Sequence, residues 1–223
     1  MSSESHRVIA IDGPAASGKS SVALELARRL GFAYVNSGAM YRAITWYVLE
    51  KEVDSNDSDR IAKLVQAAAI DCTLKDNQSL ILINHVDPTP YLREDRVNNE
   101  VSQVSTVPQV RRILVEKMHD YALHDDLVME GRDIGSVVFP ETPYKFYIDA
   151  SPEVRLRRRA AEGQWDEITA RDRADSLRRS SPLIIAEDAL VIDSSNLTID
   201  GVVGEIIGRL KNKGLRVPEH SPG

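Results

Sequence analysis

The hydrophobic positions of this chain form short apolar runs that are separated by segments with helical spacing. The runs typical of buried strands are Val8–Ile11, Ala33–Val35, Leu127–Met129, Lys145–Ile148 and Leu190–Ile192. The helical patterns between and after them cover residues 22–30, 39–51, 58–69, 107–124 and 198–212. Strands that alternate with helices predict a parallel sheet with helices on both faces. In such folds, ligands bind at the carboxyl ends of the strands.

Residues 70–86 break this alternation. Ile70–Leu74 and Leu80–Ile83 are β-like, a polar stretch separates them, and His85-Val86 is suited to begin a third short strand. The pattern predicts a small antiparallel meander inserted into the α/β core. It leaves two interpretations open, an ordinary edge hairpin and part of a substrate-binding domain.

A glycine-rich loop follows the first strand. Residues 13–20 read GPAASGKS, which fits the phosphate-binding pattern G-x-x-x-x-G-K-[ST] between a strand and a helix. The glycines let backbone N–H groups turn toward phosphate oxygens, and the new helix points its positive end at them. Lys19 adds a charge for the β- and γ-phosphates, and the Ser20 hydroxyl is suited to ligate Mg²⁺.

Composition narrows the class of protein. The 223 residues are 42% hydrophobic and 28% charged, which is typical of a globular fold. No apolar run approaches the ~20 residues of a membrane span, and the polar start is not a secretory signal. Cys72 is the only cysteine, and the net charge is −6 with positive charge only local, as at residues 155–159. We therefore expect a cytoplasmic protein that binds neither membranes nor nucleic acid, and we expect a monomer.

Two further strand ends carry candidate side chains for a second substrate. Ser37 and Arg42 follow the second strand, where Arg42 is suited to clamp an anion. Glu130 and Arg132 follow the strand at Leu127–Met129, where Glu130 is suited to orient Mg²⁺ through water and Arg132 to bind a transferring phosphoryl group. Considered alone, Arg42 fits a solvated helix residue and Arg132 fits a turn that pairs it with Asp133.

A dense charged segment covers residues 171–178. Asp175 is suited to accept hydrogen bonds from a ribose, and Arg178 is suited to reach a phosphate. Taken alone, the alternating charges are more typical of a solvated helix face, and that interpretation is then the preferred one.

Motifs from most of the chain together carry a family resemblance. They are residues 11–14 and 18–21, residues 37–42, Ser102-Gln103-Val104, Gly131-Arg132-Asp133, Arg171 with Asp175-Ser176 and Arg178, and residues 189–193. In this order they resemble bacterial cytidylate kinases, P-loop kinases of CMP and dCMP, over about residues 8–210. The resemblance implies a P-loop NTPase-type α/β sheet flanked by helices, with the small antiparallel β insert in the acceptor-binding domain and a short lid.

The resemblance also implies a role for each candidate residue. ATP would be bound by Gly13, Pro14, Ala15, Ala16, Ser17, Gly18, Lys19, Ser20, Ser21, Arg155 and Arg159, the last two from the lid. The CMP phosphate would be held by Ser37, Arg42 and Arg132 with Arg178 nearby, the cytosine by Ser102, Arg111 and Asp133, and the sugar by Arg171 and Asp175. Lys19 and Arg132 would be catalytic, and Mg²⁺ would bind Ser20 directly and Glu130 through water.

A carboxylate and a guanidinium match cytosine, which presents an amino donor at N4 and acceptors at N3 and O2. Uracil reverses the polarity at two of these positions, so the same groups would stay unpaired. The chain departs from the family at Asn36 and Glu130, where the family often has Asp, and the stretch at residues 160–170 is shorter than usual.

We therefore expect ATP-dependent phosphorylation of CMP and dCMP to CDP and dCDP by in-line transfer. The alternatives are another P-loop kinase of nucleoside monophosphates or small metabolites and, from a different class, a nucleotide-switch binding protein. The expected organisation is a P-loop core (7–36), a CMP-binding region with the β insert (37–106), core (107–150), lid and sugar- and phosphate-binding segment (151–182), core (183–212) and a flexible tail (213–223).

Overall fold

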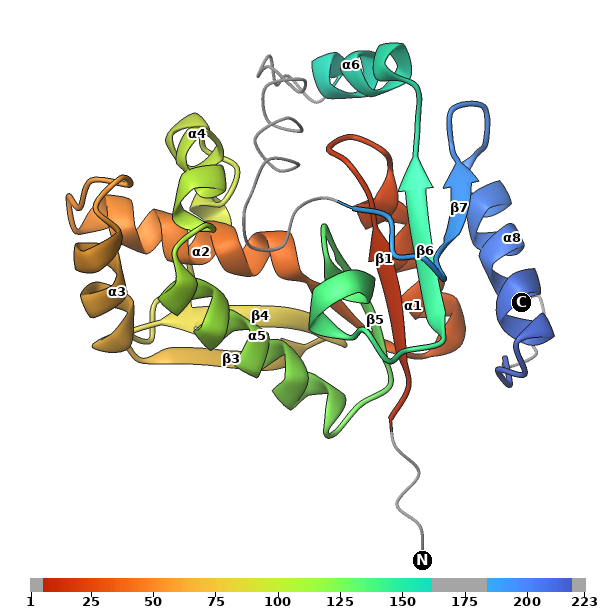
Figure 1. The fold of residues 1–223 in the computed structure, drawn as a ribbon, viewed down its shortest axis with the longest axis horizontal. Coiled ribbons are helices and arrows are strands. Elements are labelled where there is room, and N and C mark those ends of the chain that lie inside the picture. Colours follow the sequence, from red (N-terminus) through yellow and green to blue (C-terminus); the bar gives the residue numbers. More distant parts are fainter. Residues whose placement is uncertain (1–5, 162–183, 218–223) are drawn as a thin grey trace, which may run out of the picture. The chain divides into compact units, whose positions relative to one another are not determined.

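The computed structural model describes residues 6–161 and 184–217. Figure 1 labels its helices and strands. The chain forms two compact units, of which residues 36–124 make one, and residues up to 35 together with those from 125 onward make the other. We call them the insert unit and the core unit.

The core unit contains a sheet whose strands follow one another out of sequence order. From one side to the other, the order is β2 (Ala33–Asn36, whose last residue belongs to the insert unit), β5 (Leu127–Gly131), β1 (Val8–Asp12), β6 (Tyr144–Asp149) and β7 (Leu190–Asp193). β1 is parallel to both β5 and β6, and β6 is parallel to β7. The α/β prediction is confirmed, and the parallel pairing brings the carboxyl ends of β1, β5 and β6 to one edge.

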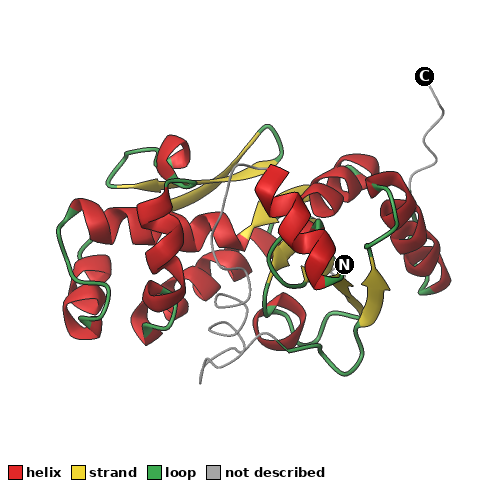
Figure 2. Ribbon diagram, turned by 90° about the horizontal axis from the view of Figure 1, so that it is seen from above, coloured by secondary structure: helices red, strands yellow, loops and turns green. Residues whose placement is uncertain are grey.

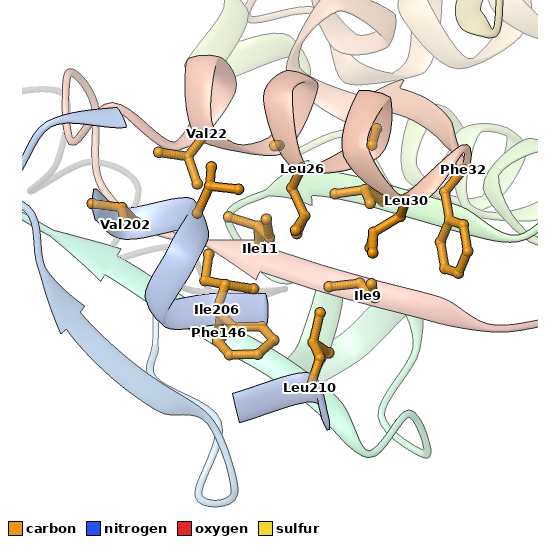
Figure 3. Packing of buried hydrophobic residues seen from close by; sticks show 14 of the residues in the cluster. Ile9, Ile11, Val22, Leu26, Leu30, Phe32, Phe146, Val202, Ile206 and Leu210 are labelled. Carbon is orange, nitrogen blue, oxygen red and sulfur yellow. The ribbon is translucent and has the colours of Figure 1, made fainter. Parts of the chain in front are cut away.

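Helices α1 (Lys19–Leu30) and α8 (Ile199–Asn212) pack their apolar sides onto the strands of the core unit. Figure 3 shows Val22, Leu26 and Leu30 of α1 directed at Ile9 and Ile11 of β1. The spacing of three to four residues places the α1 side chains on one face of the helix. α8 adds a second apolar stripe to the same cluster. This packing fixes the start of α1, and with it the loop that precedes the helix.

The insert unit combines helices with a two-stranded ribbon, which Figure 2 shows in yellow among red helices. Its elements are α2 (Ser37–Glu50), α3 (Ser58–Gln66), β3 (Ile70–Lys75), β4 (Gln78–Ile83), the 3₁₀ turn η1 (Thr89–Tyr91), α4 (Asp95–Val104) and α5 (Pro108–Ala122). Helix α2 packs against α3, α4 and α5. The unit extends to residue 124 because α5 packs on α2 and α3, whereas we had placed residues 107–124 with the core.

The antiparallel insert is a hairpin, and the predicted third strand is wrong. β3 pairs with β4 from Ile70↔Ile83 to Lys75↔Gln78, and the left-handed residues Asp76 and Asn77 make the turn. Asn84 and His85 are also left-handed (φ 49° and 66°), so the chain reverses at once and Val86 makes only an isolated bridge to Ile83.

Four elements in the described part of the chain have no counterpart among the helices predicted from the sequence: η1, α4, a single π-helical turn, η2 (Ile134–Val138), and α6 (Pro152–Ala161). Within residues 6–161 and 184–217, no helix is both long and apolar enough to cross a membrane.

Candidate functional site

The phosphate loop of the core unit connects β1 to α1. Gly13 has φ 155°, and a Cβ there would lie 2.1 Å from the backbone oxygen of Ile148 on β6. Gly18 caps α1 in the left-handed conformation (φ 87°). Each glycine therefore serves a separate requirement, close approach to a strand at Gly13 and a backbone reversal at Gly18.

Two residues between these glycines are unusual. Ala16 has φ 58°, a conformation that costs a residue with a Cβ roughly 1–2 kcal/mol. The side chain of Ser17 is fully buried, and its Oγ has no hydrogen-bond partner within the described part of the chain. Buried polar atoms without a partner are rare, and this one lies in the loop where the sequence predicts phosphate oxygens.

Lys19 and Ser20 form the first turn of α1, which contains no acidic residue. Lys19 Nζ lies 3.1 Å from the backbone oxygen of Pro14, so the amine folds back over the loop. Ser20 Oγ donates to Glu130 Oε2 at 2.8 Å, and Tyr34 donates its phenolic hydrogen to Glu130 Oε1, also at 2.8 Å. The carboxylate of Glu130 is buried at the end of β5.

These oxygens fit a magnesium ion. No group of three or more His, Cys, Asp or Glu side chains that could hold a metal occurs in residues 6–161 and 184–217. Mg²⁺ does not require one, because it keeps several waters and binds through one or two protein oxygens and the substrate phosphates. The Ser20 hydroxyl at the start of α1 and the Glu130 carboxylate at the end of β5 match that pattern.

The loop that follows β5 is joined to the phosphate loop from both sides. Arg132 donates from Nη1 to the backbone oxygen of Gly13 at 3.0 Å. In the other direction, the carboxylate of Asp12 accepts from the backbone N–H groups of Ile134 and Gly135, each at 2.8 Å. Asp133 is buried and follows Arg132 in the same turn.

Asp12 is fully enclosed. Burial raises its pKa to about 7, and the nearby Asp133 charge acts in the same direction, while the hydrogen bonds from Gly135 and Ile134 and the charge of Lys19 oppose the rise. The two backbone hydrogen bonds show that Asp12 holds the turn after β5 in place, although burying its charge is unfavourable.

Helix α6 (Pro152–Ala161) brings arginines to the same loop. Arg155 Nη1 lies 3.3 Å from the oxygen of Ala15. Arg158 donates to the oxygens of Ser17 (3.1 Å) and Ser194 (2.8 Å) and to Ser194 Oγ (3.1 Å). Arg159 is half-buried in the last turn of the helix. Of the two lid arginines predicted to bind ATP, Arg155 therefore reaches the phosphate loop, as does Arg158, which the sequence prediction does not include.

In the insert unit, the two residues predicted to bind the CMP phosphate, Ser37 and Arg42, lie in the first half of α2. Asn36 caps this helix, because its Oδ1 accepts from the N–H of Ala39 at 2.9 Å. Ser37 is buried in the first turn. Arg42 donates to the oxygen of Gly38 at 2.9 Å and lies 3.4 Å from Oδ1 of Asn98 on α4. The departure at Asn36 thus has a local role as a helix cap.

Ser102 and Arg111 come from the helices packed beside α2. Ser102 lies on α4, and Arg111 is buried on α5 with its guanidinium 5.6 Å from the ring centre of Tyr41. Cation–π contact of this kind holds a guanidinium in place while leaving its N–H groups directed elsewhere. The predicted residues of the insert unit thus lie on three helices that pack together. Arg171, Asp175 and Arg178 lie outside the described residues.

Each unit contains contact residues that sequence reasoning did not select: Asp12, Tyr34 and Arg158 in the core unit and Asn98 in the insert unit. Asp12 had a signal, since a carboxylate that ends a buried strand directly before a phosphate loop needs a partner. Tyr34 and Asn98 had none, because their partners depend on which strands and helices become neighbours.

A phosphate loop between β1 and α1, a hydroxyl–carboxylate pair at its end and arginines around it define a P-loop nucleotide kinase. The family model described as cytidylate kinase matches residues 9–212. The cytidylate kinase of Desulforamulus reducens is 42% identical over 213 residues, covering 91% of this chain and 96% of that protein. Those of Solibacter usitatus and Streptococcus mutans are each 40% identical, over 92% of this chain and 93% and 96% of theirs. The chain belongs to the cytidylate kinase family, and it is an enzyme that transfers phosphoryl groups.

Proposed function

We propose that this cytidylate kinase transfers the γ-phosphoryl group of Mg²⁺-bound ATP in line to the phosphate of CMP or dCMP. The observation that carries the proposal is the phosphate loop, in which Lys19 folds over the loop while Ser20 is hydrogen bonded to Glu130. Little base catalysis is needed, because a phosphomonoester is already mostly anionic near neutral pH, with a second pKa of about 6.

The residues of the core unit have positioning and charge-neutralising roles in this proposal. Lys19 moves from the Pro14 oxygen to the β- and γ-phosphates, and Arg132 stabilises the charge of the transferring group. Ser20 and Glu130 hold the Mg²⁺, whose chemical contribution is to neutralise charge on the phosphate oxygens. Arg155 and Arg159 add cations above the loop, and the closed site keeps water from competing as acceptor.

The acceptor is bound mainly by the insert unit. Ser37 and Arg42 bind the CMP phosphate, and Ser102 and Arg111 read the cytosine together with Asp133. The hydrogen bonds that hold Arg42 to Gly38 and Asn98 support this role, because they fix the guanidinium before any ligand arrives. Arg171 is assigned to the sugar on the resemblance, and Asp175 and Arg178 are assigned to the sugar and the phosphate on the resemblance together with their side-chain chemistry.

The proposal includes a monomer that works in the cytoplasm. One chain supplies residues for both the donor and the acceptor, and its single cysteine cannot form an internal disulfide.

A coupled assay with Mg²⁺-ATP against CMP, dCMP, UMP and AMP tests the reaction. We expect turnover with CMP and dCMP and a kcat/KM at least a hundredfold lower with UMP and AMP. Lys19→Ala is the control for the donor site and should nearly abolish kcat while circular dichroism stays unchanged. Preferred use of AMP or UMP, or a fully active Lys19→Ala variant, contradicts the proposal.

A further inference from the structure

We propose that Tyr34 is a positioning residue for the metal–nucleotide site and acts through Glu130. The inference rests on the Mg²⁺ site of the proposed function and goes beyond it, because the proposed function gives Tyr34 no role.

The geometry assigns one carboxylate oxygen to each neighbour. Tyr34 Oη donates to Oε1 of Glu130, and Ser20 Oγ donates to Oε2, both at 2.8 Å. Tyr34 lies on β2 and Glu130 on β5, which are neighbours in the sheet. Both side chains are buried, with exposed fractions of 8% and 2%.

The phenol therefore sets the rotation of the carboxylate. A glutamate carboxyl turns easily about its last bond, since that torsion is broad and has no strong staggered preference. With Oε1 held by the phenol, Oε2 faces Ser20. The Ser20 hydrogen then points at Glu130, and the lone pairs of its oxygen stay available to a cation.

The same arrangement explains how a glutamate serves at this position. Glutamate has one more rotatable bond than aspartate, so its oxygens are harder to place by backbone position alone. A second anchoring point, the Tyr34 hydroxyl, removes that freedom before nucleotide and metal arrive. Pre-organisation of this kind favours binding because less ordering remains to be done in the complex.

The test measures metal binding rather than turnover. Mn²⁺ serves as the probe, and electron paramagnetic resonance reports free Mn²⁺ in solutions of the full-length protein with ADP. Tyr34→Phe removes only the hydroxyl, and we expect it to weaken Mn²⁺ binding to the enzyme–ADP complex about three- to tenfold, the range of one net hydrogen bond. Affinity for ADP in EDTA, measured by calorimetry, should stay within a factor of two of wild type.

Tyr121→Phe is the matched control. Tyr121 is also buried and donates its hydroxyl to a backbone oxygen, that of Thr73, within the insert unit. Tyr121→Phe should lower the melting temperature about as much as Tyr34→Phe does, and it should leave Mn²⁺ affinity unchanged. A double-mutant cycle with Glu130→Ala then tests whether Tyr34 acts on the metal through Glu130. If Tyr34 acts through Glu130, adding Tyr34→Phe to Glu130→Ala should cause no further loss of Mn²⁺ affinity.

Three results overturn the proposal: unchanged Mn²⁺ affinity in Tyr34→Phe, an equal loss of ADP affinity in EDTA, or additive losses in the cycle. They leave the proposed reaction intact. If wild-type enzyme and ADP together retain no more Mn²⁺ than ADP alone, the metal site of the proposed function is itself wrong, and the role of Tyr34 falls with it. Should Glu130→Ala fail to fold, Tyr34→Phe and Tyr121→Phe still decide the question.

Discussion

Arg132 donates a hydrogen bond to the backbone oxygen of Gly13, so the side chain expected to stabilise the transferring phosphoryl group is anchored on the loop expected to bind its donor. The contact is 3.0 Å long and joins residues that are 119 positions apart in the chain. A second connection is made by the Asp12 carboxylate, which accepts hydrogen bonds from the backbone N–H groups of Ile134 and Gly135. The two loops are therefore held as one piece within the core unit.

This relationship predicts a large effect of changing Arg132. Arg132→Ala should lower kcat for CMP about a hundred- to a thousandfold, the typical loss when a donor to transition-state charge is removed. Arg132→Lys keeps the charge but lacks the planar guanidinium, which could bind a phosphate while it donates to Gly13, so it should recover only part of kcat. Steady-state kinetics measure kcat for both variants. An equal kcat in Arg132→Lys and wild type would contradict the prediction.

Asp133 should govern the choice of base. Asp133→Asn turns a pure hydrogen-bond acceptor into a group that can also donate. The variant should lose about ten- to a hundredfold in kcat/KM for CMP, and the ratio of kcat/KM for CMP to that for UMP should fall. The measurement is kcat/KM for both nucleotides in both proteins. A role limited to holding Arg132 would depress both substrates by one factor, and an unchanged ratio would remove Asp133 from the cytosine site.

The burial of Asp12 predicts a pH dependence of stability. Its pKa is raised from 3.8 to about 7, so the native protein keeps a proton that the unfolded chain has already released. The contribution of this group to stability is fully present below about pH 3.8 and is lost as the pH rises through about 7. At about 1.4 kcal/mol per pKa unit, the change amounts to a few kcal/mol.

Asp12→Asn removes this titration. Between pH 5 and pH 8, the free energy of unfolding of the variant should therefore fall less than that of the wild type, whatever the offset between them. Urea denaturation at four pH values measures both slopes, with Asp76→Asn in the exposed hairpin turn as the control that should follow wild type. Parallel curves for Asp12→Asn and wild type would refute the assignment.

The backbone conformation of Ala16 predicts that a glycine at this position stabilises the folded protein. Its left-handed backbone (φ 58°) suits glycine, so Ala16→Gly should raise the free energy of unfolding by about 1 kcal/mol. Ala15 is the matched neighbour without a positive φ, and Ala15→Gly should lower it by about 0.5–1 kcal/mol. Opposite signs in chemical denaturation support the argument, and a loss in both variants contradicts it.

The sequence predicted those parts of the fold that local pattern determines. The strand before the loop, the loop and α1 are continuous in the chain, and Val22, Leu26 and Leu30 show the helical period directly. The same reasoning failed at His85-Val86, where apolar residues suggested a strand but two left-handed residues turn the chain back. α4 was missed although its buried positions Val97, Val101 and Val104 follow the helical spacing of four and three residues.

Contacts between distant residues lay beyond such reasoning. The hydrogen bond from Tyr34 to Glu130 depends on β2 and β5 being neighbours in the sheet, although two further strands and several helices separate them in sequence. The bonds of Asp12 depend on the π-helical turn of η2, which has no recognised sequence signal. The residue types of the candidate site were therefore predictable, and the partners that hold them in place were not.

Arg158 and Ser194 are 36 positions apart, and hydrogen bonds join them to each other and to the backbone oxygen of Ser17. Both boundaries of the intervening stretch are thus fastened at one point of the core unit. A change at either anchor would therefore reach the phosphate loop directly, because Arg158 and Ser194 both donate to the backbone oxygen of Ser17.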